Sequence, residues 1–263
     1  MMIKRMILSL VLAIVFLATP LQTVAAQKPG VVDWIDLDVG GIYHALPGYT
    51  SQYLGSPKKA KKRLSEMYST YSPYYKNYLY KKLQYDDTGK LIAIYDVDGS
   101  LDKISWTRTY EYDSKGRMIK SNSISASGEL TGWTIYDYDE QDRLIKMSSY
   151  TQKTGDNPGS YFNYYYKNGR VKKTDGWAYM GGNTKGRYVY DKTGNLIKEF
   201  RRGVLVSKFK YDKLGRPIRH ITYSSDGQSV IDDSTFSYDS DGYITSIYSN
   251  EKVLLTFVYE SIP

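Results

Sequence analysis

The chain has 263 residues and 29 tyrosines, carries a formal net charge of +8, and contains no cysteine. The absence of cysteine excludes disulfide bonds, a lipoprotein anchor, a cysteine nucleophile and thiolate metal ligands. The fold must therefore be held together by packing, in which each cross-strand pair contributes on the order of 0.2 to 1 kcal/mol and aromatic pairs somewhat more.

The N-terminus is predicted to be a secretory signal peptide covering residues 1–26. Lys4 and Arg5 precede an apolar run from Met6 to Ala18, and residues 24–26 have the small side chains that a signal peptidase accepts. The apolar run is shorter than the about 20 residues of a membrane span, so an uncleaved anchor is the weaker alternative. We expect export to the extracellular space or the periplasm, with no membrane span after the signal is removed.

Removal of the signal takes Lys4 and Arg5 with it and lowers the net charge from +8 to +6. On an exported protein this excess of basic residues favours contact with wall polymers, anionic lipid surfaces or acidic glycans, and no nucleic acid is expected as a partner. The alternative is that the charge serves solubility, because lysines on solvent-facing strands also prevent edge-to-edge association.

Residues 27–75 are predicted to form an N-terminal cap segment. Val31–Val39 alternates like a strand, whereas Ser56 and Pro57 followed by Lys58–Tyr68 are typical of a capped helix with proline in its first turn. A repeat array needs such a cap, because its end unit would otherwise expose an apolar face and an unpaired edge. A small independent binding domain is the alternative.

Residues 76–263 contain one motif eight times. In full it reads Tyr110-x-Tyr112-Asp113-x-x-Gly116-Arg117-Met118-Ile119, and residues 188–197 and 209–218 match it closely. The unit tyrosines are Tyr85, Tyr112, Tyr138, Tyr166, Tyr190, Tyr211, Tyr238 and Tyr259. Two residues before them stand Leu83, Tyr110, Tyr136, Tyr164, Tyr188, Phe209, Phe236 and Phe257. Because alternate residues of a strand share a face, both large side chains are predicted to lie on one core face.

Each unit also carries the chemistry of a tight turn. An aspartate can accept a hydrogen bond from the backbone two residues on, and the glycine that follows tolerates positive φ. The pairs are Asp86 with Gly89, Asp113 with Gly116, Asp191 with Gly194, Asp212 with Gly215, and Asp239 with Gly242. Three units depart from this pattern: Asp142 replaces the glycine, the turn at 167–169 is one residue short, and the eighth unit stops at the chain end.

A second, less regular turn follows most units, at Asp98-Gly99, Ser127-Gly128, Asn157-Pro158-Gly159, Gly181-Gly182-Asn183, Arg202-Gly203 and Asp226-Gly227. Two turns per unit predict an all-β fold of tandem hairpins, in a twisted or curled antiparallel meander running from about Tyr78 to Tyr259. Helix is expected only before Thr70. The pattern does not distinguish an open sheet from a closed one.

The motif resembles the YD repeat, also called the Rhs repeat, of bacterial Rhs and wall-associated proteins and of animal teneurins. In that family long arrays of hairpins coil into a hollow shell around a cargo polypeptide, often a toxin. The resemblance covers about residues 76–263. This chain has too few hairpins for such a shell, lacks the Asp-Pro-x-Gly self-cleavage signature, and ends at Pro263 after the last unit. We therefore expect a short secreted member without a toxin domain.

The sequence holds little catalytic chemistry. Its two histidines, His44 and His220, are expected at the surface, because no Gly-x-Ser-x-Gly elbow or His-Glu-x-x-His helix accompanies them. Acidic runs at 96–102 and 239–242 resemble calcium loops, but they lack the closing glutamate and are better explained as hairpin turns. We expect a protein that is not an enzyme and that has no metal site and no cofactor.

Two tryptophans are candidates for ligand binding. Trp106 is expected on the tyrosine side of its strand, whereas Trp133 is expected on the opposite side. Trp133, Trp177 and nearby tyrosines could form an exposed platform that stacks on sugar rings, or they could belong to a second buried face. The basic residues proposed to attract an acidic polymer are Lys172, Lys173, Arg201, Arg202 and Lys208.

Three functions fit these observations. The first is a non-enzymatic binding or scaffold module at the cell surface, for wall polymer, glycan or protein. In its favour, Thr131-Gly132-Trp133 followed by tyrosines resembles the aromatic hairpins of choline-binding and glucan-binding repeats. The second is an Rhs-associated carrier or immunity partner of a toxin system. The third and weakest is a secreted glycan-active enzyme.

Overall fold

The computed structural model describes residues 62–70, 77–178 and 182–262. The predicted signal peptide, the strand predicted at Val31–Val39 and His44 lie outside these residues. The described part of the chain forms sixteen strands and contains no helix. The strands are β1 Lys62–Ser69, β2 Tyr78–Tyr85, β3 Leu91–Asp98, β4 Lys103–Tyr112, β5 Met118–Ser125, β6 Leu130–Tyr138, β7 Leu144–Thr151, β8 Ser160–Lys167, β9 Arg170–Ala178, β10 Gly182–Tyr190, β11 Leu196–Arg201, β12 Val204–Tyr211, β13 Pro217–Tyr223, β14 Val230–Tyr238, β15 Ile244–Ser249 and β16 Lys252–Ser261.

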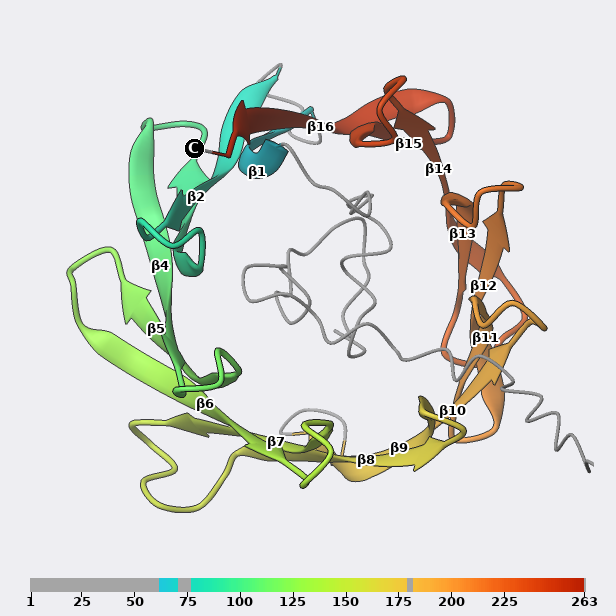
Figure 1. Cartoon of the computed structure of the whole chain (residues 1–263), viewed down its shortest axis with the longest axis horizontal. Helices are drawn as coiled ribbons and strands as arrows, with labels where there is room; N and C mark the ends of the chain where they lie inside the picture. The colour runs from blue at the N-terminus through green and yellow to red at the C-terminus, as the bar shows by residue number, and fades with distance from the viewer. Residues whose placement is uncertain (1–61, 71–76, 179–181, 263) are drawn as a thin grey trace, which may run out of the picture.

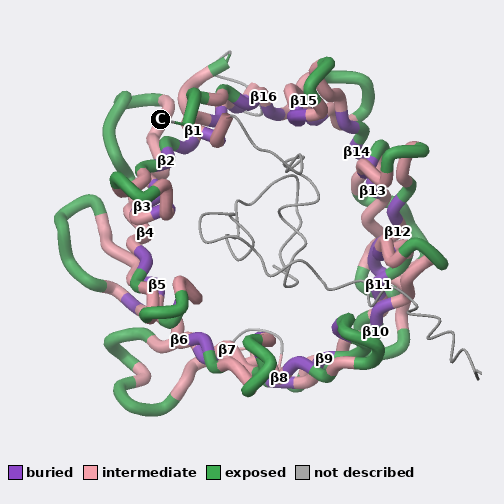
Figure 2. The backbone as a smooth tube through the Cα atoms, in the orientation of Figure 1, coloured by how far each residue is buried: buried purple, intermediate pink, exposed green. Residues whose placement is uncertain are grey.

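Every strand pairs antiparallel with its neighbours in the chain, and β1 also pairs with β16, so that the sheet closes into a ring (Figure 1). The all-β meander of tandem hairpins is confirmed. The sheet begins earlier than predicted, at Lys62, because β1 supplies the strand that joins its two ends. Buried positions recur along the strands all around the ring, and exposed positions gather at the turns (Figure 2).

The predicted turn within each unit has the expected geometry. In the second unit the Gly116 N–H donates to the Asp113 carbonyl over 2.9 Å, and the Asp113 N–H donates to the Arg117 carbonyl over 2.9 Å. The Asp113 carboxylate accepts from the Lys115 and Arg117 N–H groups, both at 2.9 Å. Gly116 has φ +80°, the left-handed region that glycine adopts without strain. The aspartate thus fixes the loop and the glycine completes it.

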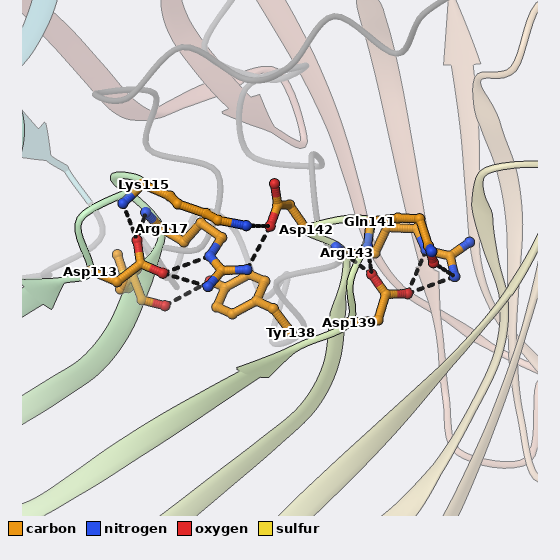
Figure 3. Close-up of polar contacts among 9 residues, drawn as sticks. Asp113, Lys115, Arg117, Tyr138, Asp139, Gln141, Asp142 and Arg143 are labelled. Atoms are coloured by element: carbon orange, nitrogen blue, oxygen red, sulfur yellow. Dashed lines mark hydrogen bonds and ion pairs between the residues drawn. The ribbon is translucent and has the colours of Figure 1, made fainter.

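Asp142 stands where other units have glycine, and it adopts the same left-handed backbone, with φ +59°. Its carboxylate accepts from Arg117 Nη1 over 2.6 Å and from Lys115 Nζ over 3.0 Å, both in the preceding unit (Figure 3). Arg117 also binds Asp113 of its own turn at 2.6 Å. Ion pairs between adjacent turns therefore accompany the backbone strain at this position.

The fourth unit is one residue short because it uses a different turn. Lys167 and Arg170 pair directly, leaving Asn168 and Gly169 as a two-residue loop. Both residues have positive φ, +53° and +73°. An Asn-Gly loop with two positive φ angles is the tight hairpin whose twist matches the flanking strands. The missing residue therefore leaves the hairpin intact.

Each odd-numbered strand contains one extra residue opposite the unit tyrosine. In β5, Tyr112 pairs with Met118 and Glu111 pairs with Lys120, so Ile119 has no partner and forms a bulge. Tyr110 then pairs with Ser121, which places Met118 and Ser121, three residues apart, on the tyrosine side. The same spacing recurs at Leu64 and Met67, Leu91 and Ile94, Leu144 and Met147, Val171 and Thr174, Leu196 and Glu199, Pro217 and His220, and Ile244 and Ile247.

We call the side of the sheet that carries the unit tyrosines the tyrosine face, and the other side the opposite face. All eight residues that stand two before a unit tyrosine are buried, with exposed fractions of 8% or less. The unit tyrosines themselves are half-buried and pack against this cluster. Seven of them donate their hydroxyl over 2.6–2.8 Å to a backbone carbonyl of the preceding strand. The predicted core face is confirmed.

The helix predicted from Lys58 to Tyr68 is wrong over the described part, Lys62–Tyr68, which belongs to strand β1. The error has a physical cause. A register shift between Leu64 and Glu66 turns both Leu64 and Met67 toward the tyrosine face. Apolar residues three apart imitate one face of a helix, although a bulged strand produces the same spacing. This strand pairs with β2, the first strand of the first hairpin.

The eighth unit is completed by β1. Tyr259 pairs with Leu64 and Val258 pairs with Glu66, which is the register that the other units have between tyrosine and bulge. Glu260 follows Tyr259 as Asp113 follows Tyr112, and its carboxylate accepts from Arg63 Nε over 2.5 Å. Arg63 precedes Leu64 as Arg117 precedes Met118. The last hairpin is therefore assembled from two segments that are distant in the sequence, and we call this junction the seam.

Candidate binding surface on the opposite face

Aromatic side chains of β6 and β7 stack on the opposite face. Trp133 is directly opposite Tyr150 across the two strands. Their ring centroids are 5.4 Å apart and the ring planes lie at 6° to each other. Both side chains are half-buried rather than enclosed. The prediction that Trp133 lies opposite the tyrosine face is confirmed, as is the placement of Trp106 on the tyrosine face of β4, where it is half-buried.

Trp177 occupies the corresponding side of β9 and pairs with Tyr161 of β8. It is among the most exposed large aromatics of the described residues, with 43% of its surface accessible. The ammonium group of Lys146 lies over the Tyr161 ring, 5.9 Å from its centroid. A cation is attracted to the face of an aromatic ring, and Tyr161 itself is half-buried.

The two aromatic pairs form one diagonal line. Ser148 pairs with Tyr161, so Tyr150, two residues further along β7, is the diagonal neighbour of Tyr161. Diagonal neighbours on one sheet face stand about 7–8 Å apart, within reach of aromatic side chains. We call this set the aromatic strip. Its members, in order across β6 to β9, are Trp133, Tyr150, Tyr161 and Trp177.

A polar row runs beside the strip. Asn163 donates to the Asp175 carboxylate over 2.9 Å across β8 and β9, and Lys146 is the partner of Asn163 on the other side. The hydrogen bond from Asn163 is the main cause that lowers the pKa of Asp175, so this carboxylate is ionised at neutral pH. Lys173 lies 4.3 Å from the Tyr165 ring centroid. The surface thus combines open aromatic faces with fixed donors and acceptors.

The structure gathers only some of the predicted cations near this strip. Lys173 extends from the opposite face of β9, and Lys172 is the exposed bulge residue beside it. Lys208 lies on β12 with its ammonium group 5.1 Å from the Tyr223 ring centroid. Arg201 pairs with Glu199 at 3.0 Å, and Arg202 donates to the Asn183 carbonyl over 2.8 Å. Arg201 therefore pairs within its own strand, whereas Arg202 lies beside Asn183, the direct partner of Trp177 on β10.

Sequence reasoning missed Lys146, Tyr150 and Tyr161. Tyr161 can be assigned to the opposite face by counting alternate positions back from Tyr166, whereas Lys146 and Tyr150 follow the bulge at Ile145, which reverses the alternation in β7. Their association with Trp133 and Trp177, however, depends on the registers between β6 and β7 and between β8 and β9. Strand alternation indicates the face of a residue but not its neighbour across the sheet.

His220 is not at the surface, contrary to the prediction. It is 2% exposed and stacks on Phe209, with ring centroids 4.4 Å apart and planes at 1°. Burial lowers the pKa of His220 to about 4, so the ring is neutral at pH 7. The bulge in β13 turns it inward, because Phe209 and His220 are direct partners on the tyrosine face.

No catalytic triad assembles around His220. The Ser234 hydroxyl donates to Asp232 over 2.6 Å, and neither ring nitrogen of His220 has a hydrogen-bond partner among the described residues. The acidic runs form turns as predicted, because Asp98 accepts from the Ser100 N–H over 2.7 Å and Asp239 accepts from the Asp241 N–H over 3.0 Å. Within residues 62–70, 77–178 and 182–262 no acidic or histidine cluster could hold a metal ion, and no helix could cross a membrane.

One comparison with known families agrees with the motif. Residues 85–130 match the family model described as RHS Repeat. This segment is an Rhs repeat. This match covers two of the unit tyrosines, Tyr85 and Tyr112, and the remaining units follow from the same turn, bulge and hydrogen bond repeated around the ring. No curated protein matches the sequence.

Several solved structures resemble the ring. The crystal structure of TcdB2-TccC3 aligns with 13% identity and a TM-score of 0.30, over 74% of this chain but 14% of that one. A porin-like protein from Bacteroides uniformis aligns with 11% identity and a TM-score of 0.42, over 79% of this chain and 100% of that one. A porin-like protein from Bacteroides vulgatus gives 15% identity, a TM-score of 0.35, and coverage of 75% and 98%. These scores are low, so the assignment rests on the motif and the family model.

Proposed function

We infer that this protein is a non-enzymatic binding module of the extracellular space or cell envelope, and that its ligand is a polysaccharide or other wall polymer. The aromatic strip is the observation that supports this function. Trp177 is open to solvent, its partner Tyr161 carries Lys146, and Trp133 extends the line through Tyr150. Flat rings beside fixed donors and acceptors suit a ligand that has both apolar ring faces and hydroxyl groups.

The charge of the surface supports an acidic ligand. Lys146, Lys172 and Lys173 lie on or beside the strip, and removing the predicted signal leaves a net charge of +6. His220 is buried without a hydrogen-bond partner among the described residues, and Ser234 is bonded to Asp232, so both observations support a role without catalysis. Attraction by exposed lysines should weaken as salt rises, because charges further apart than about 8 Å are largely screened near 0.15 M salt.

The test is co-sedimentation of the purified protein with isolated cell walls and with an anionic glycan, at low and high salt. Trp177→Ala is expected to reduce pelleting about tenfold, as for loss of a central aromatic contact of about 1.4 kcal/mol. Tyr223→Ala is the control, since it removes an aromatic ring of β13, away from the strip.

If Trp177→Ala and Tyr223→Ala reduce pelleting equally, binding lies outside the strip. If the unmodified protein pellets with neither material at low salt, polymer binding is wrong, and a protein partner becomes the function to test.

A further inference from the structure

The seam between β16 and β1 reproduces one repeat unit without a covalent turn. Seven units close their hairpin through a turn of the chain, whereas the eighth joins Glu260 to Arg63, 197 residues apart in the sequence. Arg63 also lies over the Tyr85 ring, 4.5 Å from its centroid. Arg117 has the same relation to Tyr138, at 4.9 Å. Arg63 therefore has the carboxylate contact and the ring contact of a repeat arginine.

The seam is paired as fully as a hairpin of the ring. Its register holds seven residue pairs, from Lys62 with Ser261 to Ser69 with Leu255, as many as the hairpin of β4 and β5. The Ser65 hydroxyl adds a hydrogen bond to the Val258 carbonyl at 3.1 Å. What the seam lacks is a turn of the chain. This junction is the one at which the ring can separate without breaking a hairpin.

Separation would expose two complementary edges. β16 contains the run Val253-Leu254-Leu255-Thr256-Phe257-Val258, which is apolar and rich in β-forming residues. An unpaired edge of this composition readily accepts another strand. The strand that fits it best is β1, because the register, the bulge at Ser65 and the Arg63–Glu260 pair are already matched. A second copy of the chain presents the same strand.

We propose that the seam is an exchangeable interface, in which β1 of each of two copies completes the eighth unit of the other. The exchange goes beyond polymer binding and does not depend on it. Two seams related by a two-fold axis would form a closed dimer in which both edges are paired and every contact of the monomer seam is retained. Because no covalent turn crosses the seam, the same contacts serve within one copy or between two.

A charge-swap experiment tests this interface. Arg63→Glu alone places two like charges at its own seam, and so does Glu260→Arg. When the two variants are mixed, exchange puts unlike charges at both seams of a mixed dimer. Native mass spectrometry of each variant and of the mixture, incubated at high protein concentration, is expected to show mixed dimers enriched several-fold over dimers of either variant alone. A mixture that stays monomeric would overturn the proposal.

A second pair of variants keeps the test valid if the charge swap prevents folding. The chain has no cysteine, so Arg63→Cys and Glu260→Cys each add a single thiol, at positions that are direct partners in the register. Mixed and oxidised, they are expected to form the disulfide between unlike copies well above the statistical share. Arg63→Cys mixed with Glu129→Cys, which places the second thiol in an exposed turn, gives the statistical reference. Equal yields in the two mixtures would rule out exchange.

Discussion

At the scale of single residues, each unit tyrosine contributes a packed ring and one hydrogen bond. Tyr112 lies against the buried cluster and donates its hydroxyl to the Leu91 carbonyl over 2.7 Å. Burial raises the pKa of Tyr112 well above its usual value, so the hydroxyl stays protonated and remains a donor. The alternation of apolar residues in the sequence predicted the ring's position, but the carbonyl acceptor depends on strand pairing and could not be read from it.

The hydrogen bond can be measured apart from the packing. Tyr112→Phe keeps the ring and removes the hydroxyl, so it should lower the free energy of unfolding by about 1 kcal/mol. Tyr259→Phe is the matched control, because its hydroxyl has no partner and its removal should be neutral or stabilising. Urea unfolding of both variants gives the comparison. Equal destabilisation would show that the hydroxyl bond does not distinguish the two sites.

His220 makes the stability of the fold depend on pH. Its pKa is about 4 in the folded protein and 6.5 in its ordinary state, so the unfolded chain binds more protons between these values. The contribution of His220 to the free energy of unfolding is therefore fully present above about pH 6.5. It falls by about 3 kcal/mol as the pH drops toward 4. His220→Phe should flatten the denaturation profile over that window. An unchanged slope in the variant would assign the effect to other groups.

At the scale of elements, the hairpin turns follow from the sequence more completely than the strands do. The Asp-x-x-Gly motif fixed the position and the backbone of the turn at Asp113–Gly116 because both depend on residues that are close in sequence. The bulge at Ile119 depends on the partner strand and has no such signal. Its effect on spacing explains why β1 was predicted as a helix, and the equivalent bulge in β13 is what brings His220 to the tyrosine face.

Substitutions at the turn should have opposite effects in different units. Gly215 has φ +80°, and an added Cβ would meet only Asn195 at an ordinary contact distance of 3.7 Å, so Gly215→Ala should cost about 1–2 kcal/mol through backbone strain alone. Asp142→Gly relieves that strain but loses its exposed ion pairs with Arg117 and Lys115, worth about 0–1 kcal/mol. Thermal unfolding at 1 M salt, where those pairs are screened, should show Asp142→Gly more stable than the unmodified chain. A loss of stability at high salt would contradict this account.

At the scale of the whole molecule, closure decides which contacts exist. The repeat pattern predicted a meander but did not distinguish an open sheet from a closed one, since closure rests on a pairing between residues nearly 200 positions apart. Eight units proved enough to complete a ring. The aromatic strip is likewise a product of several strand registers rather than of one motif.

A disulfide bond across the seam can measure how much closure of the ring contributes to the free energy of unfolding. Arg63→Cys with Glu260→Cys, oxidised as a monomer, links a very long loop and should raise the free energy of unfolding by about 4–5 kcal/mol in the chain-entropy account. Glu111→Cys with Lys120→Cys links direct partners within one hairpin and should add about 3 kcal/mol or less. Denaturant unfolding with and without reductant gives both values. A hairpin link that stabilises more than the seam link would indicate that the ring already stays closed in the unfolding transition.

The split eighth unit also means that the ring has no structurally distinct first repeat. A gene could be permuted circularly, so that three residues ending in glycine join Glu260 to Arg63 and new termini open at the turn between Asp113 and Gly116. The spacing copies that of Asp113 and Arg117, between which three residues lie in the chain. Such a protein would have the same sixteen strands in the same order around the ring, with the break moved to another of its hairpins.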